Sequence, residues 1–64
     1  MRALLDVLTE EKRLIEEREA IRYALTTIIP YEERQFHIAG LDAVENQLKR
    51  VRIEIHEYFS QLNN

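Results

Sequence analysis

The chain has 64 residues, of which 45% are hydrophobic and 33% are charged, which is the balance of one small globular domain. It has no cysteine, one glycine and one proline, so disulfide bonds and thiolate metal sites are excluded. The sequence also lacks an apolar run of the ~18 residues that a membrane span needs.

Residues 2–28 are predicted to form the first helix, because glycine and proline are absent before Pro30 and Ala, Leu, Glu and Arg dominate. Apolar residues recur in this segment with a period of about 3.5–3.6 residues, which is typical of an amphipathic helix. They are Leu4, Val7, Leu8, Leu14, Ile15, Ile21, Leu25, Ile28 and Ile29.

Two charged residues, Glu11 and Arg18, interrupt this stripe at equivalent positions one heptad apart. One interpretation is that both long side chains reach to water at the edge of the stripe. The other is that Glu11 of one helix pairs with Arg18 of another, in which case the pair sets the register between helices.

Residues 30–39 are predicted to form a connector that contains a short helix. Pro30 suits the first turn of a helix, and the acidic residues Glu32 and Glu33 complement the helix dipole there. Gly40 is expected to break the helix before Leu41. The alternative is one long second helix that starts at Pro30 and tolerates Gly40.

Residues 41–62 are predicted to form the second helix. Apolar residues fill seven consecutive a and d positions of a heptad repeat, which is the pattern of a coiled coil. These residues are Leu41, Val44, Leu48, Val51, Ile55, Tyr58 and Leu62.

Together these elements predict an all-α fold in which residues 1–64 form one domain, a two-helix antiparallel hairpin with an interrupted helical connector. A lone hairpin leaves a flank of each stripe in water, and small domains without disulfides or metals commonly gain burial by oligomerising. We therefore expect the hairpin to dimerise into a four-helix bundle, packed parallel or antiparallel. The expected dimer core consists of Leu4, Val7, Leu14, Ile21, Leu25, Leu41, Val44, Leu48, Val51, Ile55, Tyr58 and Leu62.

Two heptad helices in about sixty residues resemble the layout of small helical-hairpin proteins that dimerise into four-helix bundles, among them plasmid copy-number regulators of the Rop type. The likeness is one of architecture and transfers no functional residue to this chain. The interrupted connector departs from the short turn of those proteins.

The residues that carry chemistry do not form a recognisable catalytic set. The histidines are His37, four residues after Glu33, and His56 on the outer side of the second helix. Glu33 and His37 on one helical face supply two metal ligands, and a metal site needs more. We therefore expect no enzymatic activity, no metal and no cofactor.

The charge pattern argues against nucleic acids and membranes as partners. Nine basic and twelve acidic residues give a net charge of −3, and the two signs are mixed along the chain. A nucleic-acid-binding protein normally presents a basic face. Acidic residues near the N-terminus, such as Asp6 and Glu10, also interrupt any signal-peptide core, so we expect a cytoplasmic protein.

The most direct functional hypothesis is a small non-enzymatic interaction or regulatory protein that works as a helical homodimer. Its candidate residues for binding a protein partner are Tyr31, Phe36 and His37, because the heptads do not dictate the connector. Two alternatives stay open. One is an RNA-regulating bundle in which Arg13 and Lys49 of two copies converge, and the other is a helical subunit of a hetero-complex.

Overall fold

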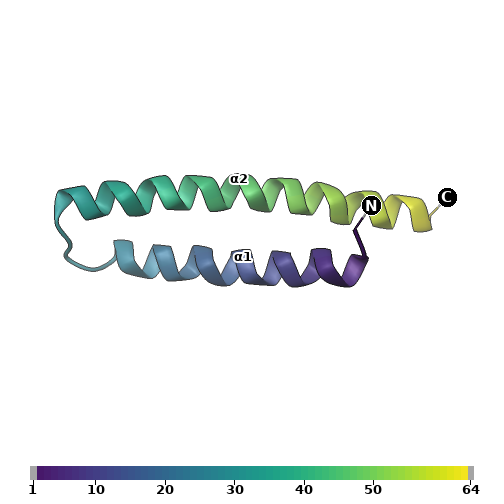
Figure 1. Cartoon of the computed structure of the whole chain (residues 1–64), viewed down its shortest axis with the longest axis horizontal. Helices are drawn as coiled ribbons and strands as arrows, with labels where there is room; N and C mark the ends of the chain where they lie inside the picture. Colours follow the sequence, from purple (N-terminus) through teal and green to yellow (C-terminus); the bar gives the residue numbers. More distant parts are fainter. Residues whose placement is uncertain (1, 64) are drawn as a thin grey trace.

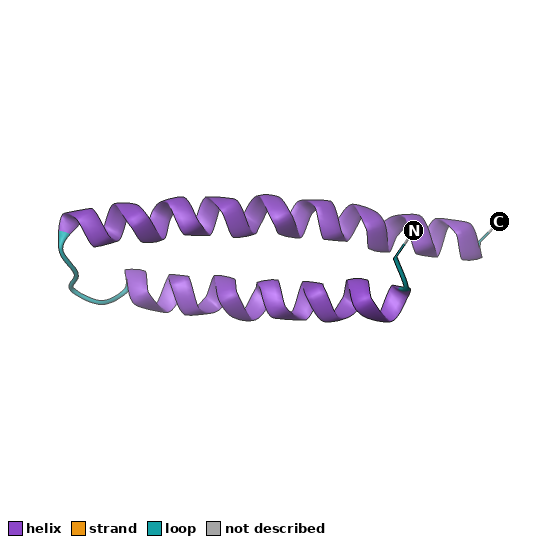
Figure 2. Ribbon diagram, viewed as in Figure 1, coloured by secondary structure: helices purple, strands orange, loops and turns teal. Residues whose placement is uncertain are grey.

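The computed structural model describes residues 2–63, which form two antiparallel α-helices joined by a short connector (Figure 1). Helix α1 spans Leu4–Leu25 with 22 residues, and helix α2 spans Tyr31–Leu62 with 32 residues. The helices pack side by side, and the molecule is 51 Å long and 15 Å wide. Within residues 2–63 every regular element is helical (Figure 2), so the prediction of an all-α hairpin is confirmed.

Helix α1 is shorter than the predicted range 2–28, because the chain leaves the helix after Leu25. The next four residues, 26–29, are all β-branched, and such residues lose side-chain freedom in a helix. The hydroxyl of Thr26 donates to the carbonyl oxygen of Tyr23 over 2.6 Å, and that of Thr27 donates to Ala24 over 2.7 Å. The backbone N–H groups of Thr26 and Thr27 donate to the same two carbonyl groups, so these bonds reinforce the end of the helix.

Helix α2 begins directly after Pro30, whose backbone is extended with φ −58° and ψ 151°. Glu32 and Glu33 lie in its first turn, where carboxylates complement the positive end of the helix dipole. The guanidinium of Arg34 reaches back across the connector and donates to the carbonyl oxygen of Leu25 over 3.3 Å. This bond ties the start of α2 to the end of α1.

The predicted break near Gly40 is wrong, and α2 runs without interruption from Tyr31 to Leu62. The predicted connector of residues 30–39 is therefore the first part of this helix, and the observed connector is residues 26–30. A glycine inside a helix costs about 1 kcal/mol relative to alanine. The packing of α2 against α1 on both sides of Gly40 outweighs this cost, so the alternative prediction of one long helix is the one observed.

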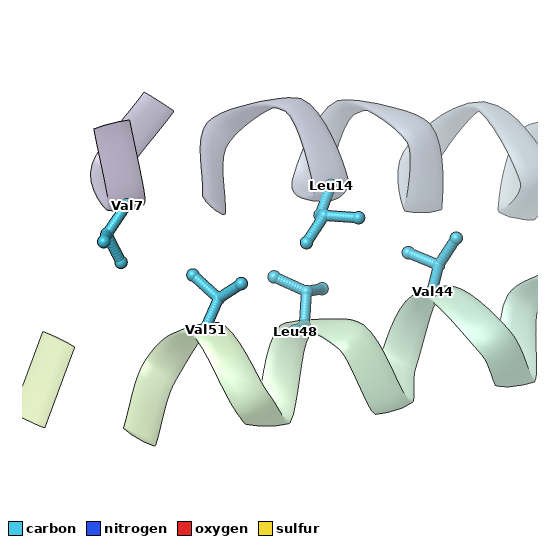
Figure 3. Close-up of a cluster of buried hydrophobic side chains, with 5 residues drawn as sticks. All are labelled: Val7, Leu14, Val44, Leu48 and Val51. Carbon is cyan, nitrogen blue, oxygen red and sulfur yellow. The ribbon is translucent and has the colours of Figure 1, made fainter. Parts of the chain in front are cut away.

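The core is a single row of aliphatic side chains between the two helices (Figure 3). Val7 and Leu14 of α1 point toward α2 and are fully buried. The remaining core residues, which come from α2, are Val44, Leu48 and Val51. Half-buried side chains, Ile15, Ile21, Ile55 and Tyr58, pack against this row. The heptad stripes predicted from the sequence are thus the surfaces through which α1 and α2 meet.

The continuous helix through Gly40 makes one substitution favourable. A Cβ atom added at Gly40 meets the Cδ1 atom of Ile21 at 3.7 Å, which is an ordinary van der Waals contact. Gly40→Ala is therefore expected to raise the free energy of unfolding by roughly 0.5–1 kcal/mol. Chemical denaturation measures this change, with Ala39→Gly as a control that shifts stability the opposite way. A loss of stability in Gly40→Ala contradicts the straight helix.

The narrow core predicts a large difference between two leucines of α2. Leu48 is 1% exposed and Leu62 is 73% exposed. Leu48→Ala is expected to lower the free energy of unfolding by about 2–5 kcal/mol, because it leaves a cavity in the row. Leu62→Ala, the matched control, is expected to change it by less than about 0.5 kcal/mol. Denaturant titration followed by circular dichroism distinguishes the two, and equal effects contradict the assigned core.

Candidate functional site

The side chains beside the core divide the hairpin into two flanks. Successive residues of an α-helix are rotated by about 100°, so the residue after a core position points to one side and the residue three positions later points to the other. Leu8 and Ile15 follow the core residues Val7 and Leu14 by one position, whereas Glu10 follows Val7 by three. The same rule applies to α2, which runs in the opposite direction and presents its equivalent positions to the same sides.

One side, which we call the charged flank, consists of Arg2, Glu10, Arg13, Gln47, Arg50 and Glu54, which line a shallow groove. The guanidinium of Arg2 donates to Glu54 over 2.7 and 3.1 Å and also to Glu10. These ion pairs join the N-terminal segment to both helices. Arg2, Glu10 and Glu54 on this flank therefore find partners within the chain.

The ion pairs of the charged flank change the acidity of their members. The hydrogen bond from Arg2 lowers the pKa of Glu54 below its ordinary value, and the hydrogen bonds to Glu54 and Glu10 raise the pKa of Arg2. Both groups are exposed to solvent, so water screens this interaction and its contribution to stability is small.

The other side, which we call the apolar flank, presents Leu8, Ile15, Ile38 and Phe59. Leu8, Ile38 and Phe59 are exposed, and Ile15 is half-buried against the core. Two ion pairs cross this flank from α1 to α2. Arg22 donates to Glu45 over 3.2 Å, and Arg52 donates to Glu11 over 3.3 Å. The apolar flank thus combines exposed hydrophobic side chains with two ion pairs, one with its arginine on α1 and one with its arginine on α2.

The structure places most of the expected dimer-core residues between the two helices of one chain. Buried among them are Val7, Leu14, Val44, Leu48 and Val51, and half-buried are Leu4, Ile21, Leu25, Leu41, Ile55 and Tyr58. Leu62 is exposed, because α2 extends past the start of α1 (Figure 1). Further burial of apolar surface in an assembly must therefore come from the flanks and the outer sides of the helices.

Glu11 and Arg18, the expected register pair, have other partners within the chain. Glu11 accepts from Arg52 of α2, and Arg18 donates to the neighbouring Glu19 over 3.3 Å. The Arg18 side chain is mostly covered and lies at the edge of the stripe. Both residues thus form ion pairs within one chain, and pairing between two copies stays a prediction.

The three candidate residues for partner binding lie in the first two turns of α2. Tyr31 and Phe36 are both exposed, whereas His37 is half-buried and contacts the Phe36 ring edge-on at 6.1 Å between ring centroids. The two exposed rings are five positions apart in the sequence, which places them about 140° apart around the helix. Tyr31 and Phe36 therefore do not form one continuous aromatic patch.

The groups that could bind a metal or a substrate do not converge. His37 and His56 lie on the same straight helix, 19 residues apart, which separates them by roughly 28 Å along the axis. Among residues 2–63 no cluster of three or more His, Asp or Glu side chains has the spacing of a metal site. An apolar hollow on the outer side of α2 is lined by Lys49, Arg52, Ile53 and His56 and is open to solvent.

The basic residues considered for RNA binding also lie apart. Arg13 donates to Glu17 over 3.0 Å on the side of the charged flank. Lys49 lies in the hollow beside Arg52, which belongs to the apolar flank. Within one chain the two residues are therefore on opposite sides of the hairpin.

Sequence reasoning included Leu8 and Ile15 in the stripe of the first helix but did not find the apolar flank as a surface. Ile38 and the pair Arg22–Glu45 were missed, because a search for apolar residues at the a and d positions does not consider the residue that directly follows a core position. That residue is the signal that identifies the flank: Leu8, Ile15 and Arg22 occupy this position on α1, and Ile38, Glu45, Arg52 and Phe59 occupy it on α2.

Comparisons with known proteins found no match to a protein-family model, a curated protein or a solved structure. In the part of the chain that the structure describes, neither helix has a stretch long and apolar enough to cross a bilayer. The arrangement of the side chains is therefore the basis for the function proposed below.

The Arg2–Glu54 contact predicts an acid-sensitive attachment of the N-terminal segment. Because the folded pKa of Glu54 is depressed, the contact contributes fully above the unfolded value near 4.5 and is lost as pH falls through the folded value. Arg2→Ala is expected to bring the Glu54 pKa back up toward 4.5. Titration of the side-chain carboxyl signal by NMR measures this change, and an unaltered titration curve contradicts the contact.

Proposed function

We propose that this chain is a small non-enzymatic interaction or regulatory module that works as a helical homodimer. The observation that carries the proposal is the imbalance between buried and exposed hydrophobic side chains. Among residues 2–63, five aliphatic residues are buried, whereas ten large hydrophobic residues are exposed. Exposed apolar surface commonly marks a site of protein association where it is contiguous, and Leu8, Ile38 and Phe59 share one flank of the hairpin.

The energetics of a small two-helix hairpin also support an assembly. A helix of a hairpin contacts its neighbour through one face only, so a single hairpin has one row of core residues and no second layer. Domains of this size bury a small fraction of their surface and gain stability by associating. Most soluble oligomers are built from identical chains, and dimers with a two-fold axis are the commonest.

The arrangement of titratable groups supports a role in binding rather than in catalysis. An active site requires an acid, a base or a nucleophile within hydrogen-bonding distance of one another in a concave pocket. In the described chain the two histidines are far apart, and the hollow beside His56 lies on one helix and is open to solvent. A rigid helical surface of this kind suits the recognition of another protein.

The proposal predicts twice the chain mass of 7.7 kDa in sedimentation equilibrium at micromolar concentration. The melting temperature is expected to rise with protein concentration, because dissociation and unfolding are coupled. A compact, fully helical monomer at these concentrations contradicts the homodimer. A poorly structured monomer also contradicts it and favours the alternative of a subunit that folds with a different chain.

A further inference from the structure

We propose that a second copy of this chain docks on the apolar flank, and that a two-fold axis relates the two hairpins. This inference rests on the proposed homodimer and names the surface through which it forms. It also assigns a role to the ion pairs Glu11–Arg52 and Arg22–Glu45, which the hairpin itself does not require for its core.

The two flanks differ in what they offer a second copy. On the charged flank, Arg2, Glu10 and Glu54 form a closed set of ion pairs. Docking on either side desolvates ion pairs, which is costly, and among residues 2–63 the groove of the charged flank is lined by no exposed hydrophobic side chain that offsets this cost. On the apolar flank, Leu8, Ile38 and Phe59 are exposed beside the half-buried Ile15. Removing these side chains from water is favourable in proportion to the apolar area that is buried.

The size of the flank agrees with a stable dimer. The hairpin is 51 Å long and 15 Å wide, which gives one side a footprint of roughly 750 Å². A standard protein interface buries about 800 Å² of each partner. A dimer therefore reaches this area only if nearly the whole length of one flank is covered.

The charges on the apolar flank make it complementary to itself. Along α1 a negative residue, Glu11, is followed by a positive one, Arg22. Because α2 runs antiparallel to α1, its charges have the opposite sign at each end of the hairpin. The positive Arg52 lies beside Glu11, and the negative Glu45 lies beside Arg22. The four charges therefore alternate in sign both along each helix and between the helices.

A two-fold rotation of this alternating pattern brings opposite charges together. If the axis crosses the helices, Glu11 meets Arg22 of the second copy and Arg52 meets Glu45, and the two connectors lie at opposite ends. If the axis runs along the hairpin, Glu11 meets Arg52 of the second copy and the connectors lie at the same end. Two copies bring the same flank face to face only through a rotation of this kind, and both arrangements pair opposite charges.

A pair of isoleucines on α2 tests which surface is buried. Ile38 lies on the apolar flank and is 43% exposed, whereas Ile53 lies on the outer side of α2 and is 59% exposed. Ile38→Glu is expected to weaken the dimer by at least about 100-fold, because it buries an unpaired carboxylate. Ile53→Glu is expected to leave the dissociation constant within about threefold of the original. Sedimentation velocity measures both, and circular dichroism checks that each variant remains helical.

Two double variants test the charge pattern while keeping each ion pair within the chain. The first swap, Arg22→Glu with Glu45→Arg, leaves two negative charges along α1 and two positive charges along α2. The second swap, Glu11→Arg with Arg52→Glu, leaves two positive charges along α1 and two negative charges along α2. With connectors at opposite ends, each swap alone is expected to be monomeric, and a mixture of the two is expected to form a one-to-one heterodimer. With connectors at the same end, each swap alone remains a dimer and the mixture forms no heterodimer.

The outcomes separate this inference from the proposed function. A monomeric wild-type chain overturns the homodimer and the docking surface together. A wild-type dimer that Ile38→Glu leaves intact overturns the docking surface alone. If Ile38→Glu dissociates the dimer and both swaps and their mixture are monomeric, the charge pairing across the flank is wrong. Dissociation by Ile38→Glu but not by Ile53→Glu, with either of the two swap patterns, supports the inference.

Discussion

The contact of α1 with α2 through one row of aliphatic side chains is the constraint on which the rest of the structure depends. A helix that packs against a single neighbour covers one face, so two helices cover one face each. Val7 and Leu14 fill this contact from α1, and Leu48 lies at its centre on α2. Among residues 2–63, every other large apolar side chain is left partly or fully in water. The hairpin is thus a folded unit with a narrow core and many exposed hydrophobic side chains.

The two flanks differ because the residues beside the core differ in kind. On the charged flank, Arg2, Glu10 and Glu54 satisfy one another within the chain. On the apolar flank, exposed hydrophobic side chains lie beside two ion pairs of opposite orientation. One pair has its arginine on α1, and the other has its arginine on α2. Arginine side chains bridge to carboxylates of the helices on both flanks. The hairpin therefore has one flank lined by charged side chains and one flank that exposes hydrophobic side chains.

The structure and the sequence agree where a periodic pattern extends over several turns. The heptads of both helices correctly identify the faces that pack, because the period of apolar residues follows directly from helix geometry. The sequence prediction and the structure disagree at Gly40. A glycine inside a helix costs about 1 kcal/mol relative to alanine, and the packing of α2 against α1 stabilises the continuous helix by more than this cost. They also disagree over residues 26–29, where β-branched residues before Pro30 end the helix earlier than the apolar pattern alone indicates.

The sequence by itself determined that this chain is helical, which face of each helix is apolar and that one hairpin is too thin to cover all of its hydrophobic residues. These properties follow from composition and periodicity, which are local. Only the tertiary structure decided that α2 continues through Gly40, that Tyr31 and Phe36 point to different sides, and that Arg22 and Arg52 reach carboxylates of the opposite helix. The reason is that the axial alignment of two helices depends on how their side chains interlock, and periodicity leaves that alignment undefined.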